Sequence, residues 1–419
     1  MKLQSLILVA ENVSLNMGGE AAEGIIYFRK LRKRNIDVRL VCHIRVKDEL
    51  HKELSPEEFE KVCFIKDMLL QRFFWNIGKN LPTRIKELVL GQLIHLIFQF
   101  QAKKTVRILV RENKIQIVFQ PTPNTPLSVS CMYNLGVPVV LGPMKGGMDF
   151  PLSFRHMDSI PVRMGLVCAK CLAMLLNKFI PGKLLADVLI IGDKETKQLL
   201  PSGYGGRVAT LFECAVDLSI WKRTKPRVFR HDRPVRFVFS GRLVDWKGVR
   251  FLIEAFRLLT LEIDAYLEIV GDGPLIGRLR DQVESLKISD YVRFHGWLPH
   301  EEMTEVLLCS DVFVMPSLRE SCGISILEAM ALSLPVIAVD WGGPARILNS
   351  ACGILVNPGS HALLVPEFFY AMKRLAGSSS LREKMGNAGR MHLISSHFDW
   401  DSKIDGLIDI FKNSLGSCK

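Results

Sequence analysis

The sequence predicts an α/β protein made of two doubly wound domains that face each other across a cleft. Its 419 residues are too many for one ordinary hydrophobic core. Short apolar runs typical of strands alternate with helical patterns, as in parallel sheets covered by helices. A polar, basic stretch with two prolines interrupts this alternation at residues 216–234, and the pattern then starts again. We therefore expect two domains joined by a linker.

The first domain is predicted at residues 1–215. It opens with an apolar run, a glycine-bearing loop, a helical pattern and a strand at Asp37–His43. This order is typical of a Rossmann-like domain. Residues 57–110 are expected to be mostly helical, and residues 160–180 are expected to form an apolar helix. Further strands are expected at residues 115–119, 137–141, 186–192 and 208–212.

The second domain is predicted at residues 235–395 and is also Rossmann-like. Its strict alternation indicates a parallel sheet with helices on both faces. Ligands of such sheets bind beyond the carboxyl ends of the strands, so the loops after the strands are the candidate sites. Strands are expected at residues 235–240, 265–270, 292–295, 311–315 and 335–339, and helices at residues 249–259, 275–286, 300–308 and 324–332.

The composition excludes a disordered chain, because 48 % of the residues are hydrophobic and 23 % are charged. The net charge of +12 is uneven: residues 1–215 contain 30 basic and 19 acidic residues, and residues 216–419 contain 25 and 24. A basic surface attracts phosphates, nucleic acid or anionic lipid headgroups, or is simply a soluble surface. Nucleic acid is not expected, because no recognisable nucleic-acid-binding module organises the charge.

The ten cysteines are scattered, and we expect free buried thiols in a reducing cytoplasm. The close pair Cys168 and Cys171 is weak support for a metal site. The apolar run Leu6–Ala10 is too short for a signal peptide, and no apolar stretch of about eighteen residues predicts a transmembrane helix. Residues 72–110 interleave basic with apolar side chains. They indicate either peripheral docking on the anionic inner face of the cytoplasmic membrane or core helices with a solvated basic face.

The stretch Pro316–Met330 reads PSLRESCGISILEAM and follows a buried apolar run. A helix is expected to begin near Ile324. The backbone N–H groups at such a helix start lack intrahelical partners and favour an anion such as a diphosphate. Glu320 and Glu328 flank this helix start, and their carboxylates can accept hydrogen bonds from sugar hydroxyls. Alternatively, Glu320 caps the helix and Glu328 is a surface residue.

Three further loops with glycine and charge are expected at the same sheet edge. Arg242 and Lys247 follow the first strand of the second domain, Gly271–Pro274 follow another strand, and His295–Trp297 follow a third. The two cations would neutralise the charge that grows on a diphosphate leaving group. Alternatively, they are ordinary surface cations.

This half of the chain resembles the family-four, or group 1, retaining glycosyltransferases, which have the GT-B fold of two Rossmann-like domains. The matching stretches are SGRLVDWKG, GDGP, HGWLP and the Glu320–Glu328 pair, in the family's order. The segment Phe398–Trp400 resembles the one that crosses back to the first domain, so residues 396–419 are expected to form a crossing helix.

The resemblance implies a role for each matching residue. Glu320 would bind hydroxyls of the donor sugar, and Arg242 and Lys247 would bind the diphosphate; these three are the candidate catalytic residues. Glu328 would bind the ribose of the nucleotide. Further donor contacts would come from Gly241, Gly271, Asp272, Gly273, His295, Gly296, Cys322, Gly323 and Ile324.

The N-terminal half matches less closely. Gly18 and Gly19 resemble the family's glycine pair, which faces the diphosphate and the acceptor, and Lys145 and Gly146 are candidate acceptor contacts. Many relatives place a histidine near the reacting carbon, and none is matched here. His43 and His156 are interpreted as structural. The absence of a protein base does not argue against glycosyl transfer, because in front-face attack the leaving phosphate can accept the acceptor's proton.

The resemblance implies transfer of a hexose from a nucleoside diphosphate sugar to an acceptor hydroxyl with retained configuration, with neither metal nor other cofactor. The basic N-terminal half favours a glycan or lipid-linked acceptor, as in surface polysaccharide or glycolipid synthesis. One alternative is a sugar-phosphate glycosyl synthase of the same fold. Another is a non-catalytic, membrane-associated protein that binds nucleotide sugars.

Overall fold

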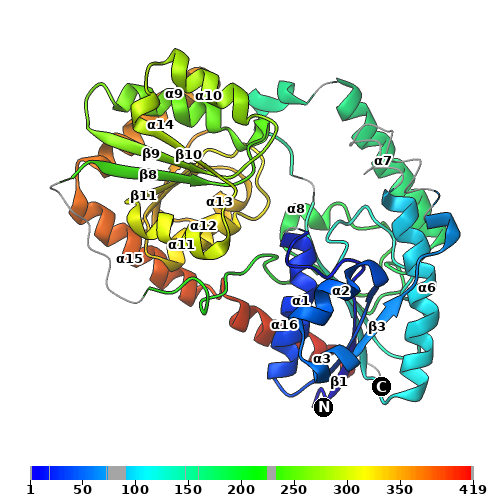
Figure 1. Ribbon diagram of the computed structural model, residues 1–419. Coiled ribbons are helices and arrows are strands. Elements are labelled where there is room, and N and C mark those ends of the chain that lie inside the picture. The colour runs from blue at the N-terminus through cyan, green and yellow to red at the C-terminus, as the bar shows by residue number, and fades with distance from the viewer. Residues whose placement is uncertain are drawn as a thin grey trace. The chain divides into compact units, whose positions relative to one another are not determined.

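The computed structural model describes residues 2–17, 19–71, 73, 91–146, 148–158, 160–223 and 233–416. These residues form two parallel sheets with helices on both faces, which confirms the predicted fold class (Figure 1). The chain divides into two compact units. The first comprises Met1–Gly147, Ile160–Glu213 and Lys403–Lys419, and the second comprises Met148–Ser159 and Cys214–Ser402.

In the first unit, the described strands form a seven-stranded sheet in the order β3-β2-β1-β4-β5-β6-β7, and all their pairings are parallel. The strands are β1 (Ser5–Val9), β2 (Asp37–His43), β3 (Val62–Ile65), β4 (Ile117–Gln120), β5 (Val139–Met144), β6 (Val188–Ile191) and β7 (Arg207–Thr210). The helices are α1 (Gly19–Lys33), α2 (Lys47–Glu53), α3 (Pro56–Glu60), α6 (Gly91–Glu112), α7 (Ile160–Phe179), α8 (Lys194–Lys197) and the last helix, α16 (Trp400–Gly416).

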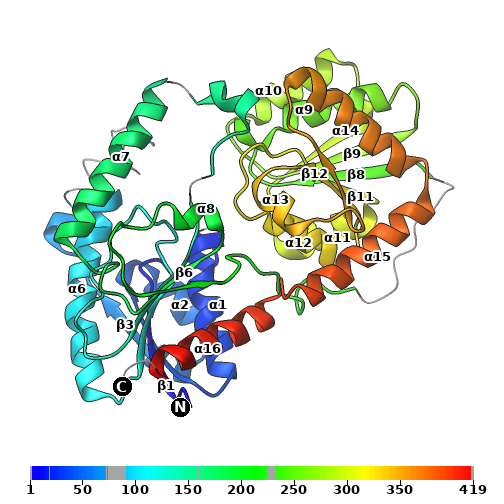
Figure 2. The same cartoon turned by 180° about the vertical axis from the view of Figure 1, so that it is seen from behind.

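The first sheet is buried between α6 on one face and α1 with α16 on the other (Figures 1 and 2). Val118 of β4 belongs to the apolar cluster that includes Phe98 of α6. Its neighbour Phe119 contacts Tyr27 of α1 and Phe411 of α16, with ring centroids 5.3 and 5.1 Å apart. Successive side chains of a strand point to opposite faces, so β4 supplies apolar groups to both layers.

In the second unit, the described strands form a six-stranded sheet in the order β10-β9-β8-β11-β12-β13, again with parallel pairings. The strands are β8 (Val235–Ser240), β9 (Ala265–Val270), β10 (Val292–Gly296), β11 (Val312–Met315), β12 (Val336–Val339) and β13 (Gly353–Val356). The helices are α9 (Val249–Leu259), α10 (Ile276–Ser285), α11 (His300–Cys309), α12 (Ile324–Ala331), α13 (Gly342–Ile347), α14 (His361–Ala376) and α15 (Ser379–Ser395).

Helices α9, α10 and α14 cover one face of the second sheet, and α11 and α12 lie on the other (Figure 1). Helix α9 has an apolar stripe, and its side chains Leu252, Phe256 and Leu259 are fully buried. A helix of this type gains most of its stability from packing one face against a sheet.

Each sheet has one position where the strand order reverses. The reversal lies between β1 and β4 in the first unit and between β8 and β11 in the second. The connections that leave these neighbouring strands run in opposite directions, so a crevice forms beyond their carboxyl ends. The two reversals therefore identify the two sheet edges at which ligands are expected.

Two strands differ from the predicted pattern. Residues 57–110 were expected to be mostly helical, but Val62–Ile65 form the edge strand β3 between two helices. Strand β13 was not predicted. Each has only four residues, and such short apolar runs do not distinguish a strand from a turn of buried helix by periodicity alone.

The segment Met148–Ser159 belongs to the second unit, which corrects the predicted first domain of residues 1–215. Trp341 Nε1 donates a hydrogen bond to the carbonyl oxygen of Asp149, 2.8 Å away. The ring of Phe154 packs edge to face on a phenylalanine of α9, 5.6 Å between centroids. These contacts join residues far apart in sequence. A domain boundary that is predicted from the local alternation of strands and helices therefore cannot take them into account.

Candidate functional site

The candidate donor site lies at the strand reversal of the second sheet. Strands β8 and β11 are neighbours there, and the loops that follow them carry Arg242, Lys247 and Glu320. Both strands are buried runs of apolar residues, so the loops after them are the first polar segments beyond the sheet. The predicted catalytic residues are thus positioned by two adjacent strand ends.

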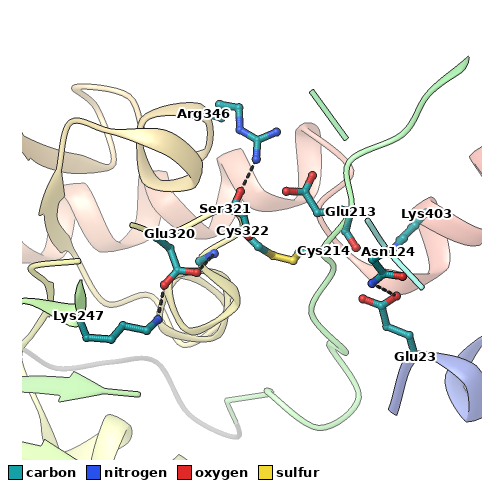
Figure 3. Close-up of a disulfide and its surroundings, with 11 residues drawn as sticks. Glu23, Asn124, Glu213, Cys214, Lys247, Glu320, Ser321, Cys322, Arg346 and Lys403 are labelled. Carbon is teal, nitrogen blue, oxygen red and sulfur yellow. Dashed lines mark hydrogen bonds and ion pairs between the residues drawn. A yellow bond between two sulfur atoms is a disulfide. The ribbon is translucent and has the colours of Figure 1, made fainter. Parts of the chain in front are cut away.

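Lys247 and Glu320 form an ion pair at this edge (Figure 3). Their side chains are only 17 % and 14 % exposed, so the pair is largely withdrawn from water. A hydrogen bond of 2.8 Å from the N–H of Leu318 to the carbonyl of Trp246 joins their two loops. The fold therefore holds two of the predicted catalytic residues against each other.

Helix α12 begins at Ile324, directly after Gly323 in the left-handed conformation with φ of 80°. Glu320 Oε1 accepts a hydrogen bond from the N–H of Gly323 at 3.3 Å. Glu320 therefore serves partly as a cap, as the alternative interpretation proposed, while its other oxygen binds Lys247. The first N–H groups of a helix have no intrahelical acceptor, so this end favours an anionic ligand.

Glu328 lies one turn inside α12 and is buried, with 8 % of its surface exposed. Its interpretation as a surface residue is therefore wrong. Burial raises the pKa of its carboxyl group to about 7. When ionised, such a group accepts hydrogen bonds from two neighbouring hydroxyls, and the predicted contact with ribose needs this property.

Backbone hydrogen bonds fix the remaining donor loops at the same edge. The N–H of Gly241 donates to Val270 O at 3.0 Å, and the N–H of Gly271 donates to Gly296 O at 2.7 Å. The N–H of Gly273 donates to the carboxylate of Asp272 at 2.6 Å. Arg242 is exposed and takes no part in the Lys247–Glu320 pair. Its role as a cation for the diphosphate stays a prediction.

His295 has a partner that the sequence did not reveal. Its Nε2 atom lies 2.7 Å from Glu268 Oε2 on the adjacent strand β9, and both side chains are largely buried. The carboxylate of Glu268 thus fixes the imidazole of His295 at this edge of the sheet. Strand pairing brings the two together from 27 positions apart, and no motif signals such a pair. The predicted contact of His295 with the donor base stays a prediction.

The first unit carries the predicted acceptor residues. Gly18 lies outside the described residues, and Gly19 begins α1. The N–H of Lys145 donates to Asn124 O at 2.6 Å, and the N–H of Gly146 donates to Thr196 Oγ1 at 3.1 Å. The first bond holds the loop after β5 against the loop after β4, two neighbouring strand ends, and the second holds it against helix α8, which follows β6.

A buried charged group near this loop was missed by sequence reasoning. Glu23 of α1 accepts a hydrogen bond from Asn124 Nδ2 at 3.2 Å (Figure 3). Burial raises the pKa of Glu23, although Lys403 and Lys145 act in the opposite direction. Burial also lowers the pKa of Lys403 to about 8. Lys403 lies on α16, so its proximity to Glu23 depends on the fold and has no local sequence signal.

A disulfide joins Cys214 and Cys322, whose Cα atoms are 6.0 Å apart (Figure 3). The expectation of free thiols is therefore wrong for these two cysteines, which lie 108 positions apart. Cys42, Cys131 and Cys352 are free and buried, as expected. The disulfide ties the donor loop beside Gly323 to the segment that follows β7.

The two predicted structural histidines lie in different environments. His43 is buried at the end of β2, with Nε2 3.1 Å from Asp67 Oδ1. His156 is exposed and stacks on Phe154 with ring centroids 6.3 Å apart.

Within the described parts of the chain, no cluster of three or more His, Cys, Asp or Glu residues is arranged to hold a metal ion. No helix in these same parts is long and apolar enough to cross a membrane. Arg72 and residues 74–90, which belong to the predicted membrane-docking segment, lie outside the described residues.

Two doubly wound sheets, with paired charges and a helix start at a strand reversal, define a class of α/β proteins that bind phosphorylated ligands. Residues 222–392 match the family described as glycosyl transferases group 1. This match is to the same family that the sequence resembles.

Curated relatives match part of the chain. An alpha-D-kanosaminyltransferase of Streptomyces kanamyceticus is 33 % identical over 37 % of this chain and 39 % of its own length. A GDP-mannose-dependent monoacylated alpha-(1-6)-phosphatidylinositol monomannoside mannosyltransferase of Corynebacterium glutamicum is 32 % identical over 42 % of this chain and 46 % of its own length. The chain thus spans less than half the length of these two relatives.

A solved structure matches the whole fold. The crystal structure of Anabaena HepE in complex with UDP superposes with a TM-score of 0.63 and 17 % identity, and covers 98 % of this chain and 100 % of HepE. The likeness agrees with the GT-B fold predicted from the sequence.

We expect the disulfide to stabilise the protein. Cys214→Ser should lower the free energy of unfolding by about 2–5 kcal/mol, because the bond restricts the unfolded chain over a long loop. Denaturant unfolding measures this difference. Cys309→Ser, which replaces an exposed free thiol, is the matched control and should have no effect. Equal stability of the unmodified protein with and without a reductant would contradict the prediction.

We expect donor affinity to depend on pH through Glu328. Its raised pKa of about 7 means that the carboxyl is largely protonated at pH 6 and ionised at pH 8. Ribose hydroxyls donate to the ionised form, so a nucleoside diphosphate sugar should bind up to about tenfold more tightly at pH 8. Titration calorimetry at both pH values measures this change.

The intact nucleotide sugar is the suitable ligand, because its diphosphate has no terminal phosphate that titrates in this range. Glu328→Gln should remove the pH dependence of binding. If the variant keeps the full dependence, another group is responsible for it.

Proposed function

We propose that this protein is a retaining glycosyltransferase that moves a hexose from a nucleoside diphosphate sugar to an acceptor hydroxyl. The observation that carries the proposal is the Lys247–Glu320 pair beside the start of α12, within the region that matches the group 1 family. Relatives named as a kanosaminyltransferase and a mannosyltransferase, and the UDP complex of HepE, support it.

The charges at the second sheet suit a diphosphate leaving group. Lys247, Arg242 and the helix start would stabilise the negative charge that develops as the bond from the anomeric carbon to the phosphate oxygen breaks. Binding would draw Lys247 toward the diphosphate and free the carboxylate of Glu320 for hydroxyls of the sugar. This positive charge would make a metal ion unnecessary, as the resemblance implies.

The acceptor side would need no protein base. The acceptor oxygen forms a bond to the anomeric carbon on the face that the phosphate leaves, and its proton passes to the leaving phosphate oxygen. The configuration at the anomeric carbon is then retained. The name of the phosphatidylinositol monomannoside mannosyltransferase supports a glycolipid or glycan as acceptor.

The predicted catalytic residues can be tested by turnover. Arg242→Ala should lower kcat by about 10²–10³, because one fixed cation for the leaving group is lost. Glu320→Ala should have an effect of similar size. Release of nucleoside diphosphate from a labelled donor, measured with and without acceptor, reports transfer.

Arg257→Ala is the control, because Arg257 is in the last turn of α9, at the far end of that helix from the β8 loop. Circular dichroism confirms that each variant is folded. Unchanged turnover in both Arg242→Ala and Glu320→Ala would refute the site. If the unmodified protein binds the donor but shows no turnover, the non-catalytic alternative is favoured.

We further propose that the protein associates peripherally with an anionic membrane. Helix α7 supports this, because its basic residues accompany large apolar side chains that are between 51 % and 75 % exposed. These side chains are Leu172, Met174, Leu175 and Phe179, with Met164 and Val167 nearer the start of the helix. Apolar and basic groups on one helix favour the interface of a bilayer.

Vesicle flotation tests this association. The protein should float with phosphatidylcholine vesicles that contain phosphatidylglycerol and remain unbound with phosphatidylcholine alone. Phe179→Asp should weaken flotation, whereas Leu261→Asp, at an apolar position of similar exposure in the second unit, should not. Equal flotation of the two variants would rule out α7 as the contact.

A further inference from the structure

A cavity of about 200 Å³ lies at the strand reversal of the first sheet. Asn12 lies beyond the end of β1 and Thr122 beyond the end of β4, and both line the cavity. Glu20 and Met17 also line it, on the two sides of the predicted glycine pair. The cavity thus occupies the position in the first sheet that the donor site occupies in the second.

Two further lining residues, Glu11 and His95, are bonded to each other. His95 Nδ1 lies 2.5 Å from Glu11 Oε2, and the other oxygen of Glu11 accepts a hydrogen bond from Arg45 Nη2 at 2.9 Å. Burial alone would raise the pKa of Glu11, but the hydrogen bond from His95 and the charge of Arg45 lower it. The wall of the cavity therefore carries an ionised carboxylate in a fixed orientation.

The hydrogen bonds around His95 define its tautomer. Gln99 Oε1 accepts a hydrogen bond from the N–H of Cys131 at 3.3 Å, so the amide nitrogen of Gln99 faces His95 Nε2 at 3.0 Å. His95 Nε2 then accepts a hydrogen bond, and Nδ1 donates to Glu11.

The lining favours uncharged hydroxyl groups. None of the described residues that line it is lysine or arginine, and two are glutamates, so the lining offers no cation to a phosphate or carboxylate. Asn12 Oδ1 is buried and has no hydrogen-bond partner in the described part of the chain. Carboxylate and amide oxygens accept hydrogen bonds from hydroxyls, and Met17 offers an apolar contact for carbon atoms of a ring.

We infer that this cavity, which we name the Glu11 pocket, binds an uncharged sugar ring of the acceptor through Glu11, Asn12, Glu20 and Thr122. The inference rests on the proposed function and specifies its acceptor. A volume of about 200 Å³ is below the range of about 300–1,000 Å³ for drug-sized ligands, which limits the pocket to about one ring. Arg45 and Gln99 are positioning residues, because they act through Glu11 and His95.

Ligand binding tests the pocket without need of turnover. The probes are the octyl glycosides of glucose, galactose and mannose, compared with the 6-phosphates of the same sugars, and binding is followed by saturation-transfer NMR with excess nucleoside diphosphate. At least one octyl glycoside should bind the unmodified protein, and its sugar phosphate should not. Glu11→Gln should weaken that binding about 10–100-fold, because a hydrogen bond to a charged group is lost.

Glu53→Gln is the matched control, because Glu53 is a half-exposed carboxylate of the same unit that is paired with Arg29. Thr122→Val provides a second variant that keeps the side chain's shape, and it should weaken binding about 2–10-fold. If Glu11→Gln does not fold, the binding of the octyl glycoside to Thr122→Val decides whether the Glu11 pocket holds the sugar ring.

Donor binding, measured separately by calorimetry, should change less than twofold in all three variants. A protein that binds no nucleotide sugar refutes the proposed function. The Glu11 pocket is refuted if the protein binds donor but prefers sugar phosphates to octyl glycosides. It is also refuted if the protein binds donor and all variants bind octyl glycosides equally well.

Discussion

Parallel pairing of the strands is the constraint on which both candidate sites depend. In a parallel sheet all carboxyl ends meet at one edge, so loops far apart in sequence are brought together there. Lys247 and Glu320 are 73 positions apart and form an ion pair because β8 and β11 are adjacent. In the first unit, the pairing of β1 with β4 places Glu11 and Thr122 on one cavity in the same way.

Carboxylates at the two edges are kept in different states by their surroundings. Glu11 is buried, but His95 and Arg45 more than offset the cost of burial, and its pKa falls. Burial dominates at Glu328 and raises the pKa of its carboxyl group to about 7. The same chemical group thus serves as a permanent anion in one unit and as a group that titrates near neutral pH in the other.

The sequence predicted most of the second unit closely, because its strands are short apolar runs separated by amphipathic helices. Residues 235–240, 249–259 and 265–270 match the observed elements. The positions of Glu320 and Lys247 after strand ends were also predicted, since a motif and its place in an alternating pattern are local properties. The burial of Glu328 was not, because it depends on how α12 packs.

Other features depended on contacts that no local pattern records. His295 with Glu268, Cys214 with Cys322 and Glu11 with His95 each join segments between 27 and 108 positions apart. The assignment of Met148–Ser159 to the second unit has the same origin. Patterns in a single sequence identify elements, whereas pairs of this kind require the three-dimensional arrangement.

Helix α16 has a consequence for the order in which the chain acquires its structure. From Lys403 onward it belongs to the first unit, where Phe411 covers Phe119 of the central strand β4. On a ribosome, the residues of the first sheet emerge long before residues 403–416. The apolar face of this sheet that α16 covers therefore stays uncovered until that helix has been synthesised. The second unit, contiguous apart from one short segment, can close earlier. Synthesis therefore completes the N-terminal unit last, the reverse of the usual order for proteins with two domains.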